Sequence, residues 1–216
     1  MKKFFAFMLA LLLVLCPVAA LAGNWYAEKS LILAERMHTL ASDEAYVTTF
    51  TTEDNLIAHI GALAGSDFSA PVEARMLSLP DAGSAAALMS MLSMASGGEM
   101  AQLSETARAE IIRRLPGTFV SAINGQFGVT MVAASSILST SETYIMPEDF
   151  RPGVLFLQYP GEYSVAVAFS QSGEETVSAS AMPIYSEVIQ ELAASDDLSL
   201  LERLGLNLLF QKIELE

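Results

Sequence analysis

Hydrophobic residues recur at a helical spacing through the first half of the chain. The first helix would begin at the capping residue Asn24, and its buried face would hold Tyr26, Leu33, Met37 and Leu40. Five further helices are expected from their capping residues and from the glycines and prolines that end them: one after Ser42, one from Thr51 to Gly65, one from Ser69 to Pro80, one over 84–94 and one over 104–115.

The segment 115–141 carries no charged residue over 27 positions. We interpret it as a central helix that packs on several sides, because Asn124, Gln126 and Thr130 are unfavourable in hydrocarbon. A membrane span, a broken helix and a pair of strands are the alternatives.

After Glu142 the pattern changes from helical spacing to strand alternation. The runs 154–159, 163–170 and 176–182 are separated by turn sequences at Pro160-Gly161 and Ser172-Gly173, which predicts a three-stranded antiparallel meander. In 163–170, large apolar residues alternate with serine and alanine, so we expect helices to cover the apolar face. Helices are expected over 183–194 and 196–204. The segment 206–215 is expected to be a last strand, with a continuing helix as the alternative.

These elements predict one α+β domain over residues 23–216. An N-terminal helical region, about 24–141, would pack with a small antiparallel meander of three to four strands and with C-terminal helices, over about 150–216. The segment 147–153 is the best candidate for a hinge between the two parts.

The first 22 residues have the features of a secretory signal peptide. Lys2 and Lys3 precede an uncharged apolar run over 4–15. The sequence Ala20-Leu21-Ala22 has the small residues that a signal peptidase recognises, so we expect cleavage between Ala22 and Gly23. The sequence therefore predicts a secreted or extracytoplasmic protein, with Ala20, Ala22 and Gly23 as its processing residues.

Other fates of this segment fit less well. Lipidation at Cys16 would need a small residue before it, and Leu15 is bulky. An uncleaved anchor over 4–22 would be interrupted by Pro17, and it is the condition under which a membrane becomes a partner. A buried core helix explains neither the lysines nor the cleavage pattern.

Cleavage would change the chemistry available to the chain. It would remove Cys16, the single cysteine, and with it disulfides, thiol nucleophiles and thiolate metal ligands. The formal net charge is −14, and loss of Lys2 and Lys3 would lower it by two, to −16. Such a charge repels nucleic acid, which is therefore not expected as a partner. Because 52% of residues are hydrophobic and 17% are charged, a packed domain is expected and not an acidic tail.

Candidate chemistry is limited to two histidines. Glu35 and His38 form the E-x-x-H spacing used in di-iron helical bundles, but the position that would pair with His59 is Leu56. A solvated Glu35–His38 pair and a half-buried, hydrogen-bonded His59 are therefore expected. No metal site or cofactor is predicted.

Acidic doublets and methionines also invite functional interpretations. Five doublets occur, at 43–44, 53–54, 148–149, 174–175 and 196–197, and helix starts and turns account for most of them. Several methionines and leucines could form a soft apolar surface for a peptide or lipid chain, although core packing is the expected role: Met76, Leu77, Leu88, Met89, Met91, Leu92 and Met94.

The sequence thus favours an exported, acidic, non-enzymatic domain that binds a protein or a small hydrophobic ligand. One alternative is an exported hydrolase or metal-dependent enzyme that uses His38 or His59 with nearby carboxylates. The other is a membrane-tethered extracytoplasmic domain.

Overall fold

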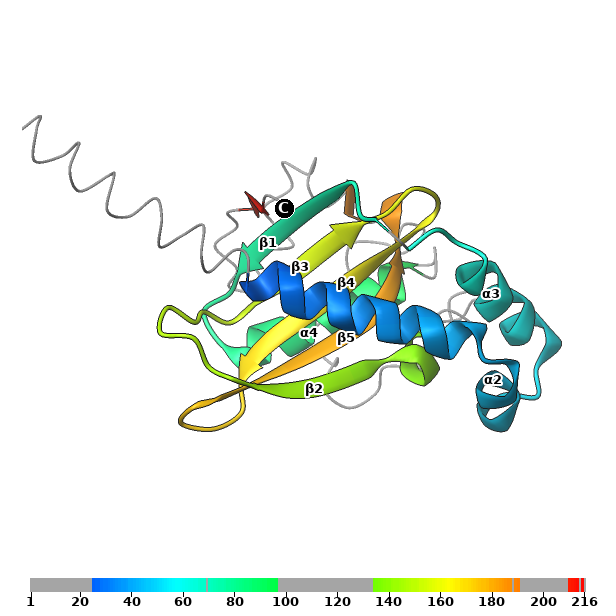
Figure 1. Ribbon diagram of the computed structural model, residues 1–216, viewed down its shortest axis with the longest axis horizontal. Helices are drawn as coiled ribbons and strands as arrows, with labels where there is room; N and C mark the ends of the chain where they lie inside the picture. The colour runs from blue at the N-terminus through cyan, green and yellow to red at the C-terminus, as the bar shows by residue number, and fades with distance from the viewer. Residues whose placement is uncertain are drawn as a thin grey trace, which may run out of the picture.

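The computed structural model of the chain describes residues 25–68, 70–96, 134–187, 189–190, 210–213 and 215. Six strands form an antiparallel sheet with the order β2-β5-β4-β3-β1-β6. A long helix over 25–42 crosses one face of the sheet, and α4 (Ala82–Ser96) lies behind the other face (Figure 1). Two short helices, α2 (Glu44–Phe50) and α3 (Asp54–Ala64), lie at one end. The α+β class is confirmed, but the sheet has more strands than the three or four expected.

The predicted meander is confirmed. It consists of β3 (Gly153–Gln158), β4 (Tyr163–Gln171) and β5 (Thr176–Tyr185), which pair consecutively. Gly161 takes a positive φ of 111° in the turn between β3 and β4, a conformation that glycine adopts without strain. The large apolar residues of β4 belong to one core with the helix over 25–42, so this helix covers the apolar face, as expected.

The helix over 25–42 buries the face that its sequence pattern predicts. Leu33 and Met37 are fully buried, Tyr26 is buried, and Leu40 packs at the margin of the core. Leu33 and Met37 each contribute about 1.5–3 kcal/mol by leaving water. The Tyr26 hydroxyl donates to the carbonyl of Arg151 at 3.0 Å and accepts from its amide at 2.8 Å. This double hydrogen bond fastens the start of the helix to the loop after β2.

The opposite face of the sheet is covered in part by α4. The helix buries Ala85, Leu88 and Leu92. Its first turn is capped by Asp81, whose carboxylate accepts from the amide of Ser84 at 2.8 Å. This hydrogen bond lowers the pKa of Asp81. The helix predicted over 84–94 is therefore confirmed and begins slightly earlier.

The prediction of a helix from Ser69 to Pro80 is wrong. This segment instead contains β1 (Glu73–Ser78), which pairs with β3 on one side and with β6 (Phe210–Ile213) on the other. Its residues have high helix propensity, but pairing on both edges and burial of Ala74, Met76 and Leu77 favour the strand. The last strand preferred within 206–215 is confirmed by β6.

The prediction of a central helix over 115–141 is also wrong at its C-terminal end. Residues 134–138 are helical, but β2 (Thr140–Ile145) follows directly and forms an edge of the sheet. The helix expected from residue 183 starts late, because 183–185 continue β5. The predicted hinge, 147–153, connects β2 to β3. β1 and the first two residues of β2 therefore come from the region that was expected to be helical.

Several predicted features lie outside the described residues. These are the signal peptide with Ala20, Ala22 and Gly23, the helices over 104–115 and 196–204, and the 196–197 doublet. Within the described ranges, no helix has both the length and the apolar character required to cross a membrane.

Candidate functional site

His38 has a structural position at the end of the first helix. Its Nε2–H donates to the carbonyl of Ala64, the last residue of α3, at 2.8 Å. Its ring stacks on Phe68 with the centroids 5.4 Å apart. Glu35, its predicted partner, is exposed on the first helix. His38 thus joins the C-terminal ends of two helices, an arrangement that the E-x-x-H spacing did not indicate.

His59 belongs to a cluster with two tyrosines at one end of the sheet. The hydroxyl oxygen of Tyr163 lies 3.2 Å from its Nδ1 and 3.3 Å from its Nε2. Because the Tyr163 oxygen is almost equally far from both nitrogens, it lies along the hydrogen-bonding direction of neither. The contact therefore does not indicate which nitrogen carries the hydrogen. The Tyr163 ring stacks on Tyr185 at 4.9 Å, and its hydroxyl donates to that of Tyr185 at 3.4 Å.

This cluster is uncharged at neutral pH. Burial lowers the pKa of His59, and the nearby carboxylate of Glu162 only partly opposes the effect. Burial also raises the pKa values of Tyr163 and Tyr185. The imidazole packs edge-on against both phenol rings, with its centroid 5.6 Å from that of Tyr163 and 6.0 Å from that of Tyr185.

The acidic doublets have mostly local roles. Asp43 caps α2 by accepting from the amide of Tyr46 at 3.1 Å, which confirms the helix start expected there. At the start of α3 the expected capping residue, Thr51, accepts from the amide of Glu53 at 3.2 Å, and Glu53 occupies the N-cap position without a side-chain hydrogen bond. In the part of the chain that the structure describes, no three His, Cys, Asp or Glu side chains are grouped closely enough to hold a metal ion.

The methionine-rich surface does not form as one helix face. Met76 and Leu77 are buried on β1, whereas Leu88 and Leu92 are buried on α4. These four residues are buried in the core, the role that was expected.

A different feature is the outer edge of β2, whose outward backbone groups have no strand partner among the described residues. The amide of Met146 donates to the carbonyl of Glu175 at 2.8 Å, which continues the pairing of β2 with β5. Backbone groups of alternate residues point to the same side of a strand. The even-numbered residues of β2 therefore bond to β5, and Ser141, Thr143 and Ile145 direct their N–H and C=O groups away from the sheet.

The side chains along this edge are exposed and sparsely protected. Ser141 and Thr143 are exposed, and Ile145 is 83% exposed, the highest value among the large exposed hydrophobic residues of the described chain. Natural edge strands are commonly blocked by proline, lysine or a bulge. Residues 140–145 contain neither proline nor lysine, and their register with β5 is continuous.

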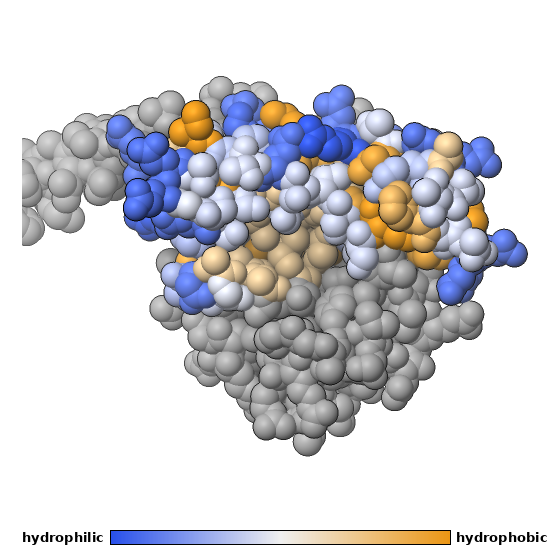
Figure 2. All heavy atoms as spheres, turned by 90° about the horizontal axis from the view of Figure 1, so that it is seen from below, coloured by the Kyte–Doolittle hydropathy of each residue, from blue (hydrophilic) through white to orange (hydrophobic). Residues whose placement is uncertain are grey.

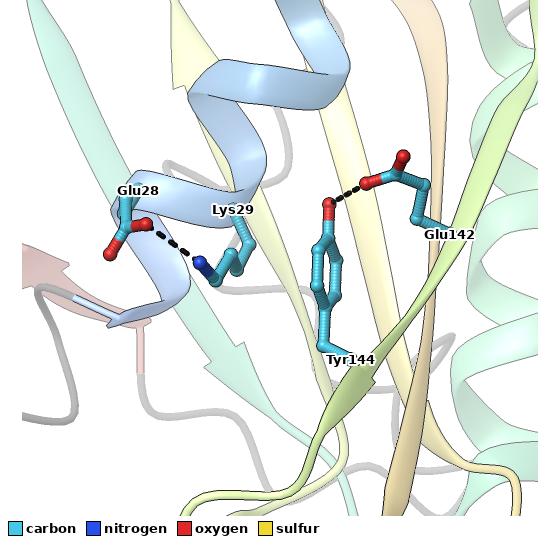
Figure 3. Close-up of polar contacts among 4 residues, drawn as sticks. All are labelled: Glu28, Lys29, Glu142 and Tyr144. Carbon is cyan, nitrogen blue, oxygen red and sulfur yellow. Dashed lines mark hydrogen bonds and ion pairs between the residues drawn. The ribbon is translucent and has the colours of Figure 1, made fainter.

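A polar network borders the same strand on the face covered by the first helix (Figure 3). The Tyr144 hydroxyl donates to Oε2 of Glu142 at 2.6 Å, and Arg36 pairs with Oε1 of Glu142 at 2.6 Å. These two contacts lower the pKa of Glu142. Lys29 Nζ pairs with Glu28 at 2.6 Å and lies 5.3 Å from the centroid of the Tyr144 ring. The network thus places both signs of charge beside the edge.

Figure 2 views the molecule from the side on which β2 lies. Strongly hydrophilic residues gather along the upper margin and at one end, weakly polar surface occupies the middle of the described part, and hydrophobic side chains gather at the other end, where α2 lies in Figure 1. On α2, Phe50 is 58% exposed and its ring contacts Tyr46 at 4.8 Å. This second surface is apolar, and the hydroxyls of Thr48 and Thr49 on α2 donate to carbonyls of their own helix.

Comparisons with protein-family models, with curated proteins and with solved structures found no match for this chain. The candidate site therefore rests on its own geometry. Sequence reasoning missed it because 140–141 was assigned to a helix. The available signal was the run Thr140-Ser141-Glu142-Thr143-Tyr144-Ile145, in which threonine, tyrosine and isoleucine favour strands.

Proposed function

We propose that this protein is an exported, non-enzymatic binding domain that receives an extended segment of a protein partner along the outer edge of β2. The observation that carries the proposal is the row of outward backbone groups at Ser141, Thr143 and Ile145. An extended segment added there would continue the antiparallel ladder and gain affinity from main-chain hydrogen bonds.

The side chains beside the ladder suit a protein segment better than a small ligand. Ile145 offers apolar area, and Glu142 and Lys29 offer charges of both signs on the opposite face. A strand that pairs with β2 would place alternate side chains against these two faces, which is how edge pairing acquires specificity.

The positions of the histidines support the non-enzymatic part of the proposal. His38 uses its Nε2–H to hold Ala64, and the half-buried His59 packs against the rings of Tyr163 and Tyr185. Among the described residues neither ring belongs to a group of three His, Cys, Asp or Glu side chains that could hold a metal ion.

Export rests on the leader sequence. An intact mass that starts at Gly23 in the secreted protein would support it. A mass that includes residues 1–22 in a membrane fraction would replace it with the tethered form.

Photo-crosslinking tests partner binding at the edge. Benzoylphenylalanine would replace Ile145 in cells that naturally produce the protein, and Val72, which is 69% exposed at the start of β1, serves as the matched control position. We expect a discrete protein adduct from position 145 and none from position 72. Adding Thr143→Pro should abolish the adduct, because proline removes an outward N–H while the bonds to β5 remain.

Two results would contradict the proposal. One is equal adduct formation from positions 145 and 72, which would indicate nonspecific contact. The other is an adduct at 145 that Thr143→Pro leaves unchanged, since main-chain pairing would then not be involved.

A further inference from the structure

We infer that the segment received by β2 is β2 of a second copy of this chain, so that two sheets join in an antiparallel, two-fold symmetric pair. This inference rests on the proposed function and names its partner. The inference follows from the register that is possible when the exposed edge of β2 pairs with the same edge of a second copy.

The pleat of the strand restricts the possible registers. When two copies pair edge to edge about a two-fold axis perpendicular to the sheet, residues directly opposite one another lie on the same face. One residue of β2 must therefore lie directly opposite its own copy, with the axis midway between the two. The candidates are Glu142, Thr143 and Tyr144, the central positions of the exposed edge.

Only the register centred on Thr143 uses the whole edge. It places Thr143 opposite its own copy and Ser141 opposite Ile145, so all three outward residues enter hydrogen-bonded pairs. Two hydrogen bonds in each of the three pairs give about six inter-chain bonds. Beyond Ile145 the edge ends at Pro147, the next outward position, which has no N–H to donate.

The neighbouring registers are worse for identifiable reasons. Centring on Glu142 would bring two carboxylates directly opposite each other, at a Cβ separation of about 4.5–5.5 Å, which is destabilising. Centring on Tyr144 would set Ser141 against Pro147 and lose donors there. Both alternatives also leave fewer complete pairs.

The side chains are complementary in the favoured register. On the face covered by the first helix, Glu142 of each copy would lie opposite Tyr144 of the other, beside which Lys29 is already held (Figure 3). Each carboxylate thus approaches an ammonium group of the second copy. On the other face, Thr143 meets Thr143, a favourable cross-strand pair, and Ile145 is partly covered by Ser141.

The strand is accessible for this pairing within the described structure. β2 is a terminal strand in the sheet order, and Figure 1 shows it along the lower margin of the sheet with no labelled helix or strand outside it.

Engineered cysteines test the register directly. With Cys16 absent through cleavage or through Cys16→Ser, Thr143→Cys should form a disulfide-linked dimer, because Cα atoms of a hydrogen-bonded pair lie about 5.5 Å apart. Ser141→Cys alone should not, since its copy would lie about 14 Å away along the strand. A mixture of the Ser141→Cys and Ile145→Cys proteins should form the mixed disulfide.

Sedimentation of the protein without engineered cysteines tests association itself. We expect a mass twice that of the monomer at about 100 µM, and at least tenfold weaker association for Thr143→Pro. Thr143→Val keeps the N–H and should remain dimeric. Circular dichroism of each variant verifies that it is folded.

The failures of the two proposals are distinguishable. A monomer at 100 µM without Thr143→Cys disulfides overturns the self-pairing, and so does a dimer that Thr143→Pro leaves intact. If the adduct at position 145 then contains a different protein, binding at the edge stands and only the identity of the partner is wrong. If neither a dimer nor an adduct forms, both proposals fail.

Discussion

Replacing Tyr26 with phenylalanine removes one hydroxyl group that makes two hydrogen bonds and leaves the ring in place. The hydroxyl donates to the carbonyl of Arg151 at 3.0 Å and accepts from its amide at 2.8 Å. The ring meets Phe169 edge-on at 5.0 Å and stacks on Phe150 at 6.3 Å, and phenylalanine would keep both contacts. The change therefore isolates the attachment of the first helix to the loop after β2.

The expected loss follows from the number of bonds and their setting. A net value of about 0.5–1.5 kcal/mol for each bond gives about 1–3 kcal/mol. Because Arg151 is exposed, water can replace part of the lost bonding, which favours the lower half, about 1–2 kcal/mol. For a domain of about 200 residues this is a fall in Tm of roughly 2–8 °C.

Urea unfolding provides the assay. Far-UV circular dichroism follows the whole fold, and fluorescence of Trp25, the single tryptophan, follows the first helix, because its ring lies 5.7 Å from that of Phe169. Tyr46→Phe is the matched control: its hydroxyl makes one bond, to the carbonyl of Ile137 at 3.2 Å, and its loss should cost about 0.5 kcal/mol. A loss below about 0.5 kcal/mol for Tyr26→Phe would refute the proposed attachment.

Three further predictions concern pH and the backbone. Burial lowers the pKa of His59 below its usual 6.5, so at acidic pH the unfolded chain binds a proton that the folded chain does not. Stability should therefore fall as the pH drops below about 6.5. His59→Gln should remove this dependence of the unfolding free energy on pH, measured by urea titrations between pH 7 and 5. Burial raises the pKa values of five tyrosines: Tyr26, Tyr144, Tyr159, Tyr163 and Tyr185. Stability should therefore decrease above pH 10, where these residues ionise only in the unfolded chain. Ultraviolet titration should show ionisation and unfolding together, and ionisation without unfolding would contradict this. Gly153→Ala would place a Cβ against the carbonyl oxygen of Leu77 and should lower the free energy of unfolding by at least about 1–3 kcal/mol. In the control, Gly61→Ala in α3, the new Cβ meets nothing within 4 Å, so the free energy of unfolding should rise by up to about 1 kcal/mol. Equal urea midpoints for the two variants would contradict the close approach of β1 and β3.

The elements with strong periodicity could be predicted from the sequence. The positions of Leu33 and Met37 repeat at the helical period, and both are fully buried in the first helix. Val165 and Val167 alternate with small residues, and the meander forms there with both side chains inside. In these segments the local preference and the tertiary environment favour the same structure.

β1 and β2 were missed for different reasons. The residues of β1, such as Glu73, Arg75 and Leu77, prefer helices, and only pairing with β3 and β6 makes this segment extended. In β2, one side of the strand is solvated, so Ser141 and Thr143 are polar where a central strand would be apolar. An edge strand of this kind lacks the hydrophobic alternation by which strands are identified.

The candidate site depends on the second of these strands. The sequence singled out His38 and His59 because of their chemistry, yet His38 holds a helix end and His59 packs among tyrosines. The outward row at Ser141, Thr143 and Ile145 consists of backbone groups, which every residue possesses. The residue types of 140–145 indicate a strand, but they do not indicate that this strand stands at an edge of the sheet.

The sequence by itself determined the α+β class, the first helix, α4, the meander and the acidic character of the chain. These follow from residue spacing and composition, which act locally or through the sum of charges. Only the tertiary structure decided that β1 and β2 are strands, that β2 stands at an edge, and that its odd-numbered residues face outward. Strand order and hydrogen-bond direction arise from pairing between segments distant in sequence, and that pairing is set by the packing of the whole sheet.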